Sequence, residues 1–151
     1  NENAWAYISF ADLFGFDEID LSTSPTYTFN FDLRIEDGIP EVAGLMLAND
    51  NFINNIGGSH GRYTFQFAGT QNYGFDDFQY NTDALGSWQS FSITLDDYLS
   101  GAYEYLVFIN DCDNENCDNT VKFRNFSVTV PEPGMIGLFA LSLLGMRRFR
   151  K

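Results

Sequence analysis

Residues 27–36 read Tyr27-Thr-Phe-Asn-Phe-Asp-Leu-Arg-Ile-Glu36, and apolar and polar side chains alternate along them without a break. A period of two places every apolar side chain on one face of an extended chain, which is typical of a half-buried β-strand. The Asp37-Gly38 pair that follows is a common turn sequence. This stretch therefore predicts a strand with one face in a hydrophobic core.

Shorter stretches of the same kind lie on both sides of it. We expect strands at residues 5–10, 42–47, 62–67, 89–95, 103–109 and 121–130, with a weaker candidate at 75–80. The 103–109 stretch is apolar on both faces, so we expect it in the centre of a sheet. Residues 96–100 are expected to form one helical turn, and no other helix is predicted before Pro131. Many short strands separated by turn residues predict an all-β fold, an antiparallel β-sandwich over residues 1–130.

The last predicted strand changes face in its middle. Val121 and Phe123 share one face, whereas the apolar residues from Phe126 onward share the other. One extra residue near Arg124-Asn125 restores the register, so the sequence predicts a β-bulge there. The alternative is a strand that is covered on both faces.

Three of these strands share a further pattern. They read Trp88-Gln-Ser-Phe-Ser-Ile-Thr-Leu95, Tyr105-Leu-Val-Phe-Ile-Asn110 and Val121-Lys-Phe-Arg-Asn-Phe-Ser-Val128. In this they resemble the last strands of carbohydrate-binding-module-like, or galactose-binding-like, jelly rolls. The resemblance implies a jelly-roll sandwich and identifies no ligand. Because a strand pattern begins almost at Asn1, we also expect the domain to be incomplete at its N-terminus.

Residues 131–151 differ in composition from the rest. In Pro131-Glu132-Pro133, two prolines so close together cannot continue a strand ladder, and residues 135–146 carry no charge. The chain then closes on a basic cluster of Arg147, Arg148, Arg150 and Lys151. Basic residues stay on the cytoplasmic side of a membrane, so we expect the sandwich on its other side. The apolar run falls short of the about 20 residues of a full span, and we expect a short apolar C-terminal helix that acts as a transmembrane anchor. The alternative, a soluble helix docked on the sandwich, would need a polar face that this run lacks.

This order of parts resembles the PEP-CTERM sorting signal of Gram-negative bacteria. The resemblance implies export, a transient anchor in the inner membrane, and cleavage near Pro131-Glu132-Pro133 by an exosortase-type peptidase. It further implies release to the cell surface or to an extracellular polysaccharide matrix. The same segment also resembles the C-terminal region of some ice-binding proteins.

The charge of the chain is strongly negative. The formal net charge is −13, and all 21 acidic residues lie at or before Glu132, whereas four of the eight basic residues lie at 147–151. A body this acidic repels phosphate backbones, so we exclude nucleic acid as a partner. It attracts cations such as Ca²⁺, although solubility in an exposed environment also explains the charge.

One loop combines cysteines with acids. Residues 111–118 read Asp111-Cys-Asp-Asn-Glu-Asn-Cys-Asp118. Two cysteines in an exported chain predict a disulfide between Cys112 and Cys117. Four alternating carboxylates in the loop are candidate Ca²⁺ ligands: Asp111, Asp113, Glu115 and Asp118. The loop is no EF-hand, and a solvated acidic loop is the alternative.

The ligand candidates are polar and aromatic residues beside Asn and Gly: Trp88, Tyr73, Tyr80 and Gln89. Such residues stack on sugar rings or bond hydroxyls, but they also pack in cores. No nucleophile motif or phosphate loop occurs, so we expect no enzyme. The sequence therefore predicts a non-catalytic binding module, with polysaccharide as a candidate partner. The alternatives are a structural surface or biofilm protein, an ice-binding protein and, less favoured, a glycosidase-like enzyme.

Overall fold

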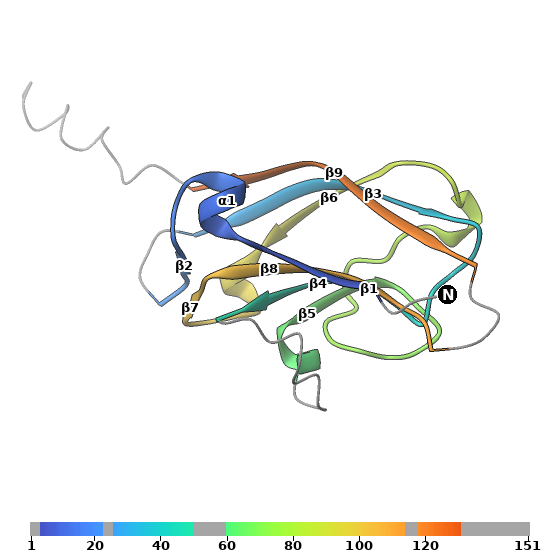
Figure 1. Ribbon diagram of the computed structural model, residues 1–151, viewed down its shortest axis with the longest axis horizontal. Coiled ribbons are helices and arrows are strands. Elements are labelled where there is room, and N and C mark those ends of the chain that lie inside the picture. Colours follow the sequence, from blue (N-terminus) through green and yellow to red (C-terminus); the bar gives the residue numbers. More distant parts are fainter. Residues whose placement is uncertain (1–3, 23–25, 50–59, 114–117, 131–151) are drawn as a thin grey trace, which may run out of the picture.

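The computed structural model describes residues 4–22, 26–49, 60–113 and 118–130 (Figure 1). Short helical elements are the α-helix α1 (Phe10–Phe14) and the 3₁₀ turns η2 (His60–Tyr63), η3 (Thr82–Ala84) and η4 (Leu95–Asp97). The strands are β1 (Ala4–Ser9), β2 (Ile19–Asp20), β3 (Thr28–Glu36), β4 (Val42–Ala48), β5 (Thr64–Ala68), β6 (Gln89–Thr94), β7 (Ala102–Tyr103), β8 (Tyr105–Asp111) and β9 (Thr120–Thr129).

The strands form two antiparallel sheets that face each other (Figure 1). One sheet has the order β1-β8-β4-β5 and the other the order β6-β3-β9, while β2 and β7 form a small separate ladder. The alternation predicted for β3 is confirmed, because its apolar side chains are buried and the polar ones between them are half-buried. The expected central position of the 103–109 stretch is also confirmed, since β8 lies between β1 and β4.

Phenyl rings fill the space between the sheets. Phe31 is 2% exposed, and its ring centroid lies 5.1–5.9 Å from the centroids of four other rings: Phe67, Phe91, Phe123 and Phe126. Rings at this separation contribute more than their buried area alone. The chain is rich in phenylalanine because these rings fill the core.

The predicted bulge in the last strand is confirmed. The register between β3 and β9 shifts where Asn30 pairs with Ser127 and Asp32 pairs with Arg124. Asn125 lies in this irregularity with a φ of 54°, a conformation that asparagine tolerates better than most residues. The extra residue lets apolar side chains on both sides of the bulge point into the same core.

The weak strand predicted at residues 75–80 is wrong. Phe75 forms one isolated parallel bridge with Phe65, and the chain then continues as a loop. Aromatic residues recur in this stretch because the loop lays their rings on the core. The ring centroids of Phe75 and Phe78 lie 5.1 and 5.5 Å from that of Tyr98. A loop that covers a core edge can thus imitate a strand pattern.

The helix α1 was not predicted from the sequence, and the strand expected at residues 5–10 ends at Ser9, where α1 begins. The Ser9 hydroxyl accepts a hydrogen bond from the Asp12 amide at 3.0 Å, and Gly15 ends α1 in the left-handed conformation at a φ of 81°. Both are standard capping arrangements. With five residues, α1 is too short to show helical periodicity, and it buries only Phe10. The turn expected at 96–100 is present one residue earlier, as η4.

No helix in the described ranges is long and apolar enough to cross a bilayer. The predicted anchor at residues 135–146 lies outside those ranges, so the helix expected there stays a prediction.

Candidate functional site

Aromatic side chains gather on the outer face of the four-stranded sheet. Trp5 and Tyr7 come from β1, Tyr105 comes from β8, and Tyr73 comes from the loop after β5. Trp5, Tyr73 and Tyr105 pack on a small apolar cluster that is separate from the main core. Tyr7 is 42% exposed, with its ring centroid 6.0 Å from that of Tyr105. An outer sheet face is ordinarily polar, so a group of aromatic side chains there is a candidate interaction site.

The Trp5 and Tyr73 rings form the centre of this surface. Their centroids are 6.3 Å apart and their planes stand at 89°, an edge-to-face arrangement. The Trp5 indole Nε1 donates a hydrogen bond to Asp111 Oδ1 at 3.2 Å. The aromatic pair is therefore joined directly to the acidic loop that follows β8.

A buried glutamine holds Tyr73 in place. Gln66 is 4% exposed; its Nε2 donates to the Gln71 carbonyl at 2.6 Å, and its Oε1 accepts from the Tyr73 amide at 2.6 Å. Gly74 at a φ of +99° ends the loop, and a Cβ there would lie 2.2 Å from the Thr64 carbonyl oxygen. Buried polar side chains with both ends bonded are rigid, so the loop backbone that carries Tyr73 is held in place.

Three carboxylates meet beside this aromatic pair. The ligand atoms of Glu41, Asp111 and Asp113 all lie within 4.8 Å of one another. The Asp113 amide donates to Glu41 Oε2 at 2.8 Å, which fixes the loop against the start of β4. Burial raises the pKa of Asp111, as do the neighbouring Asp113 and Glu41 carboxylates, although the Trp5 hydrogen bond acts in the other direction. Burial and Asp111 likewise raise the pKa of Tyr73.

The structure brings together two of the four predicted metal ligands, Asp111 and Asp113. Glu115 lies outside the described residues, and Asp118 is exposed and does not belong to this carboxylate group. Glu41 was missed, because it is distant in sequence and reaches the loop only through the pairing of β4 with β8. Cys112 is buried and carries no free thiol, but Cys117 is outside the described residues, so the pairing of the two stays a prediction.

Of the predicted ligand residues, only Tyr73 joins this surface. Tyr80 is 3% exposed, and its hydroxyl, with a single hydrogen to donate, lies 2.7 Å from the Ser87 carbonyl oxygen and 3.1 Å from that of Ala84, so its ring is a core element. The Gln89 side-chain amide accepts a hydrogen bond from the Asn81 backbone N–H and donates one to the Asn81 carbonyl, and these two bonds close the loop between the residues. Trp88 lies at the other sheet, where the Arg124 guanidinium carbon is 4.0 Å from its ring centroid.

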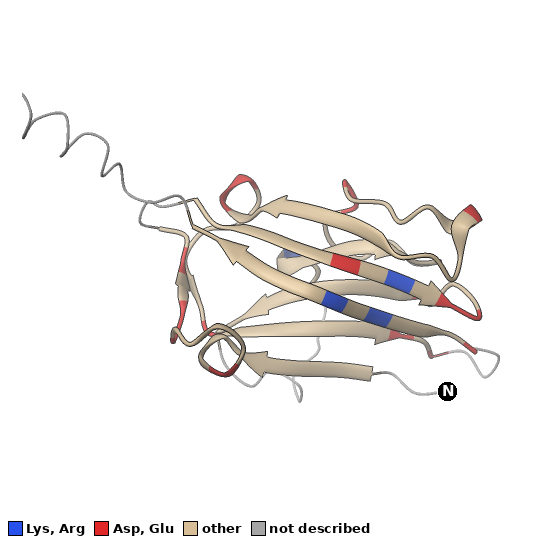
Figure 2. Cartoon of the chain, turned by 90° about the horizontal axis from the view of Figure 1, so that it is seen from above, with Lys and Arg blue, Asp and Glu red and all other residues tan. Residues whose placement is uncertain are grey.

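The outer face of the three-stranded sheet carries charged residues of both signs (Figure 2). Asp32 accepts hydrogen bonds from Ser90 at 2.7 Å, Asn125 at 2.7 Å and Arg124 at 3.1 Å. The bonds from Ser90 and Asn125 are the main reason why the pKa of Asp32 is lowered. The Asp32 carboxylate is therefore satisfied by hydrogen bonds within the sheet.

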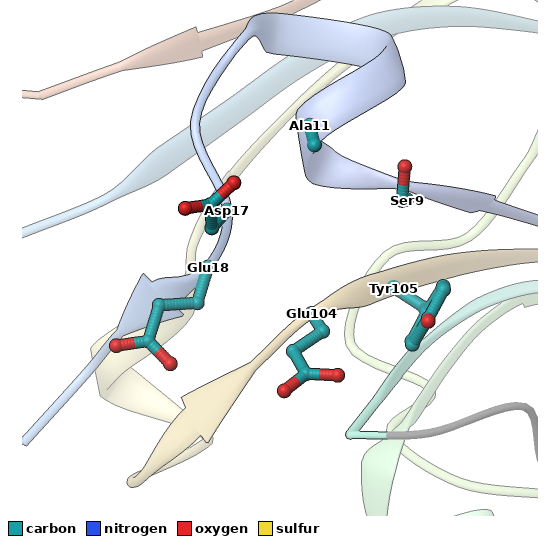
Figure 3. Close-up of a pocket in the computed structure, with 6 residues that line it drawn as sticks. All are labelled: Ser9, Ala11, Asp17, Glu18, Glu104 and Tyr105. Atoms are coloured by element: carbon teal, nitrogen blue, oxygen red, sulfur yellow. The ribbon is translucent and has the colours of Figure 1, made fainter.

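A second acidic surface lies beyond α1. Ser9, Asp17, Glu18, Glu104 and Tyr105 line a shallow cavity of about 260 Å³, shown in Figure 3. Its three carboxylates come from the loop before β2 and from Glu104 between β7 and β8, and all are exposed. Among the described residues, these acids do not form a group close enough to share a metal ion. The Glu41–Asp111–Asp113 cluster is thus the better candidate site.

Replacing Asp111 with Asn is expected to raise the melting temperature at pH 7 in the absence of divalent cations. The folded pKa of Asp111 lies above 3.8, so folding disfavours the ionised carboxylate, and this cost is present above the folded pKa. The gain should disappear below about pH 3.8, where both states are protonated. Asp17→Asn removes the same charge at an exposed position and is the control. Equal gains in both variants would assign the effect to net charge alone.

Comparison with known proteins identifies one segment. The PEP-CTERM protein-sorting motif matches residues 129–151. No curated protein and no solved structure matches the chain. The motif indicates export and surface localisation in Gram-negative bacteria and processing by exosortase, a membrane peptidase. The sorting signal read from Pro131 to Lys151 is therefore confirmed, and the protein is an exosortase-sorted exported surface protein.

Proposed function

We propose that the β-sandwich is a non-catalytic binding module for an extracellular polysaccharide, with Trp5 and Tyr73 at the centre of its binding surface. The observation that carries this proposal is the meeting of these two rings with three carboxylates on one sheet face. Ligand sites combine aromatic surface with a few fixed polar groups, and sugar rings suit this combination. Export to the cell surface brings the module to its ligand.

Ca²⁺ is the cofactor in this proposal. Glu41, Asp111 and Asp113 offer only oxygen ligands, which suit a hard cation. Ca²⁺ takes about 6–8 oxygens, so these residues leave positions for water or for sugar hydroxyls. Its charge would also offset the repulsion among the three carboxylates. Sugar binding and cation binding are therefore expected to support each other.

A glycan array with the chain that ends at Val130, the form expected after processing, tests the proposal with and without Ca²⁺. We expect binding that is stronger with Ca²⁺ and about tenfold weaker in Trp5→Ala, since an aromatic contact is worth about 1.4 kcal/mol. Trp88→Ala removes the same side chain from the other sheet and should bind normally. Circular dichroism of each variant separates lost binding from lost folding.

Three outcomes would count against this function. Absence of binding under both conditions would favour a structural surface protein or an ice-binding protein. Equal losses in Trp5→Ala and Trp88→Ala would place the binding surface elsewhere. Hydrolysis of a bound glycan would show that the module is an enzyme. Binding that is unaffected by Ca²⁺ would overturn only the role of the carboxylates.

A further inference from the structure

The strand pairs of the sandwich are nested. β4 pairs with β5, β3 with β6, and β1 with β8, all antiparallel, as in one long hairpin that has been rolled up. In this order, each later strand of the chain pairs with an earlier one. The next strand after β8 is β9, so the same order would pair β9 with a strand that precedes β1. In the described part of the chain β9 is the end strand of its sheet, paired with β3 on one side only. A jelly roll of two complete sheets has one strand more.

The inner face of β1 is left uncovered in the described part of the chain. β1 pairs with β8, and its residues opposite Asn110 and Phe108 are Ala4 and Ala6. Both alanines face the same side as the main core, yet both are exposed. Figure 2 shows β1 lying beyond the edge of β9, so the three-stranded sheet does not reach over it. One layer of the sandwich is thus wider than the other.

The residues beside this position are incompletely covered as well. Phe108 of β8 and Phe123 of β9 pack against each other in the core, with their ring centroids 4.9 Å apart. Both side chains nevertheless remain only half-buried. Asn110 Oδ1 is buried, and within the described ranges it has no hydrogen-bond partner. Exposed core rings, an open strand edge and an unsatisfied buried oxygen are each unfavourable. All three occur along the same strip between β1 and β9.

We propose that one additional β-strand, supplied by residues that precede Asn1 in the full-length protein, pairs antiparallel with β9 and covers the inner face of β1. Its inward side chains are apolar and pack on Ala6 and Phe108, and its outward ones are polar. The strand is short, because α1 already covers one end of the strip between β1 and β9. There the ring centroid of Phe14 lies 6.0 Å from that of Phe126. The nested pairing order selects this occupant over a second copy of the chain.

The test compares the chain 1–130 with the same chain extended by the residues encoded upstream of Asn1. In the extended chain we expect slower hydrogen exchange of every second β9 amide, because those amides gain partners. Ala6→Asp should lower the melting temperature by about 10 °C more in the extended chain than in the short one, since it buries a carboxylate there. Ala11→Asp, at an exposed position in α1, should have the same small effect in both chains.

Equal exchange of the β9 amides in both chains would overturn the proposal, as would equal effects of Ala6→Asp. Sedimentation of the short chain addresses the other occupant. A dimer that protects β9 and persists in the extended chain would show that a second copy fills this edge. A short chain that associates, and becomes monomeric on extension, supports the added strand.

Discussion

Phe31→Ala is expected to lower the free energy of unfolding by about 3–5 kcal/mol, because it removes a large side chain from the centre of the core. Phe31 is 2% exposed and contacts rings from β5, β6 and β9, so several strands lose packing at once. The surrounding rings are rigid and cannot collapse fully into the space. Domains of this size are stable by only about 5–15 kcal/mol, so much of the stability would be lost.

Chemical denaturation of the chain ending at Val130 measures this loss. Phe78→Ala is the matched control, since Phe78 is half-buried at the core edge beside Phe65 and Tyr98. It should lose clearly less than Phe31→Ala. Similar losses for the two variants would mean that the sheets do not pack around Phe31 as described.

The parts of the fold that could be predicted are those that a local pattern encodes. The period of two in β3 determines which side chains face the core, whatever strands lie beside it. The bulge at Asn125 could be predicted for the same reason, because the apolar residues change from one face to the other within a single strand. The order of the strands in the two sheets could not be predicted, since strand pairing depends on contacts between segments that are distant in sequence.

The candidate site was only partly predictable for the same reason. Trp5 and Asp111 are 106 residues apart in sequence and meet only because β1 pairs with β8. In the sequence, Trp5 belongs to an apolar stretch and gives no sign that it faces outward. The burial of Tyr80 could not be predicted either. Loop backbone carbonyls can satisfy a buried hydroxyl as well as water does, so its polar group does not keep it at the surface.

Replacing Pro131, Glu132 and Pro133 together with Ala is expected to abolish release of the protein from the cell. The sorting motif spans residues 129–151 and implies exosortase processing, and the resemblance places the expected cleavage near Pro-Glu-Pro. The fold should not change, because β9 ends at Thr129, before the substituted residues. Full-length chain should therefore accumulate in the membrane fraction, whereas the normal chain appears outside the cell without its tail.

Mass spectrometry of the C-terminus and cell fractionation together distinguish the steps of sorting. A second variant with Gln at Arg147, Arg148, Arg150 and Lys151 removes the charges that are expected to hold the tail on the cytoplasmic side. That variant should be lost from the membrane with its tail still attached, because it escapes before cleavage. The triple Ala variant should instead be retained, since its predicted anchor at residues 135–146 is unchanged. Release of the triple Ala variant with the normal C-terminus would mean that cleavage does not depend on Pro-Glu-Pro, and that the apolar run and the basic cluster suffice as the signal.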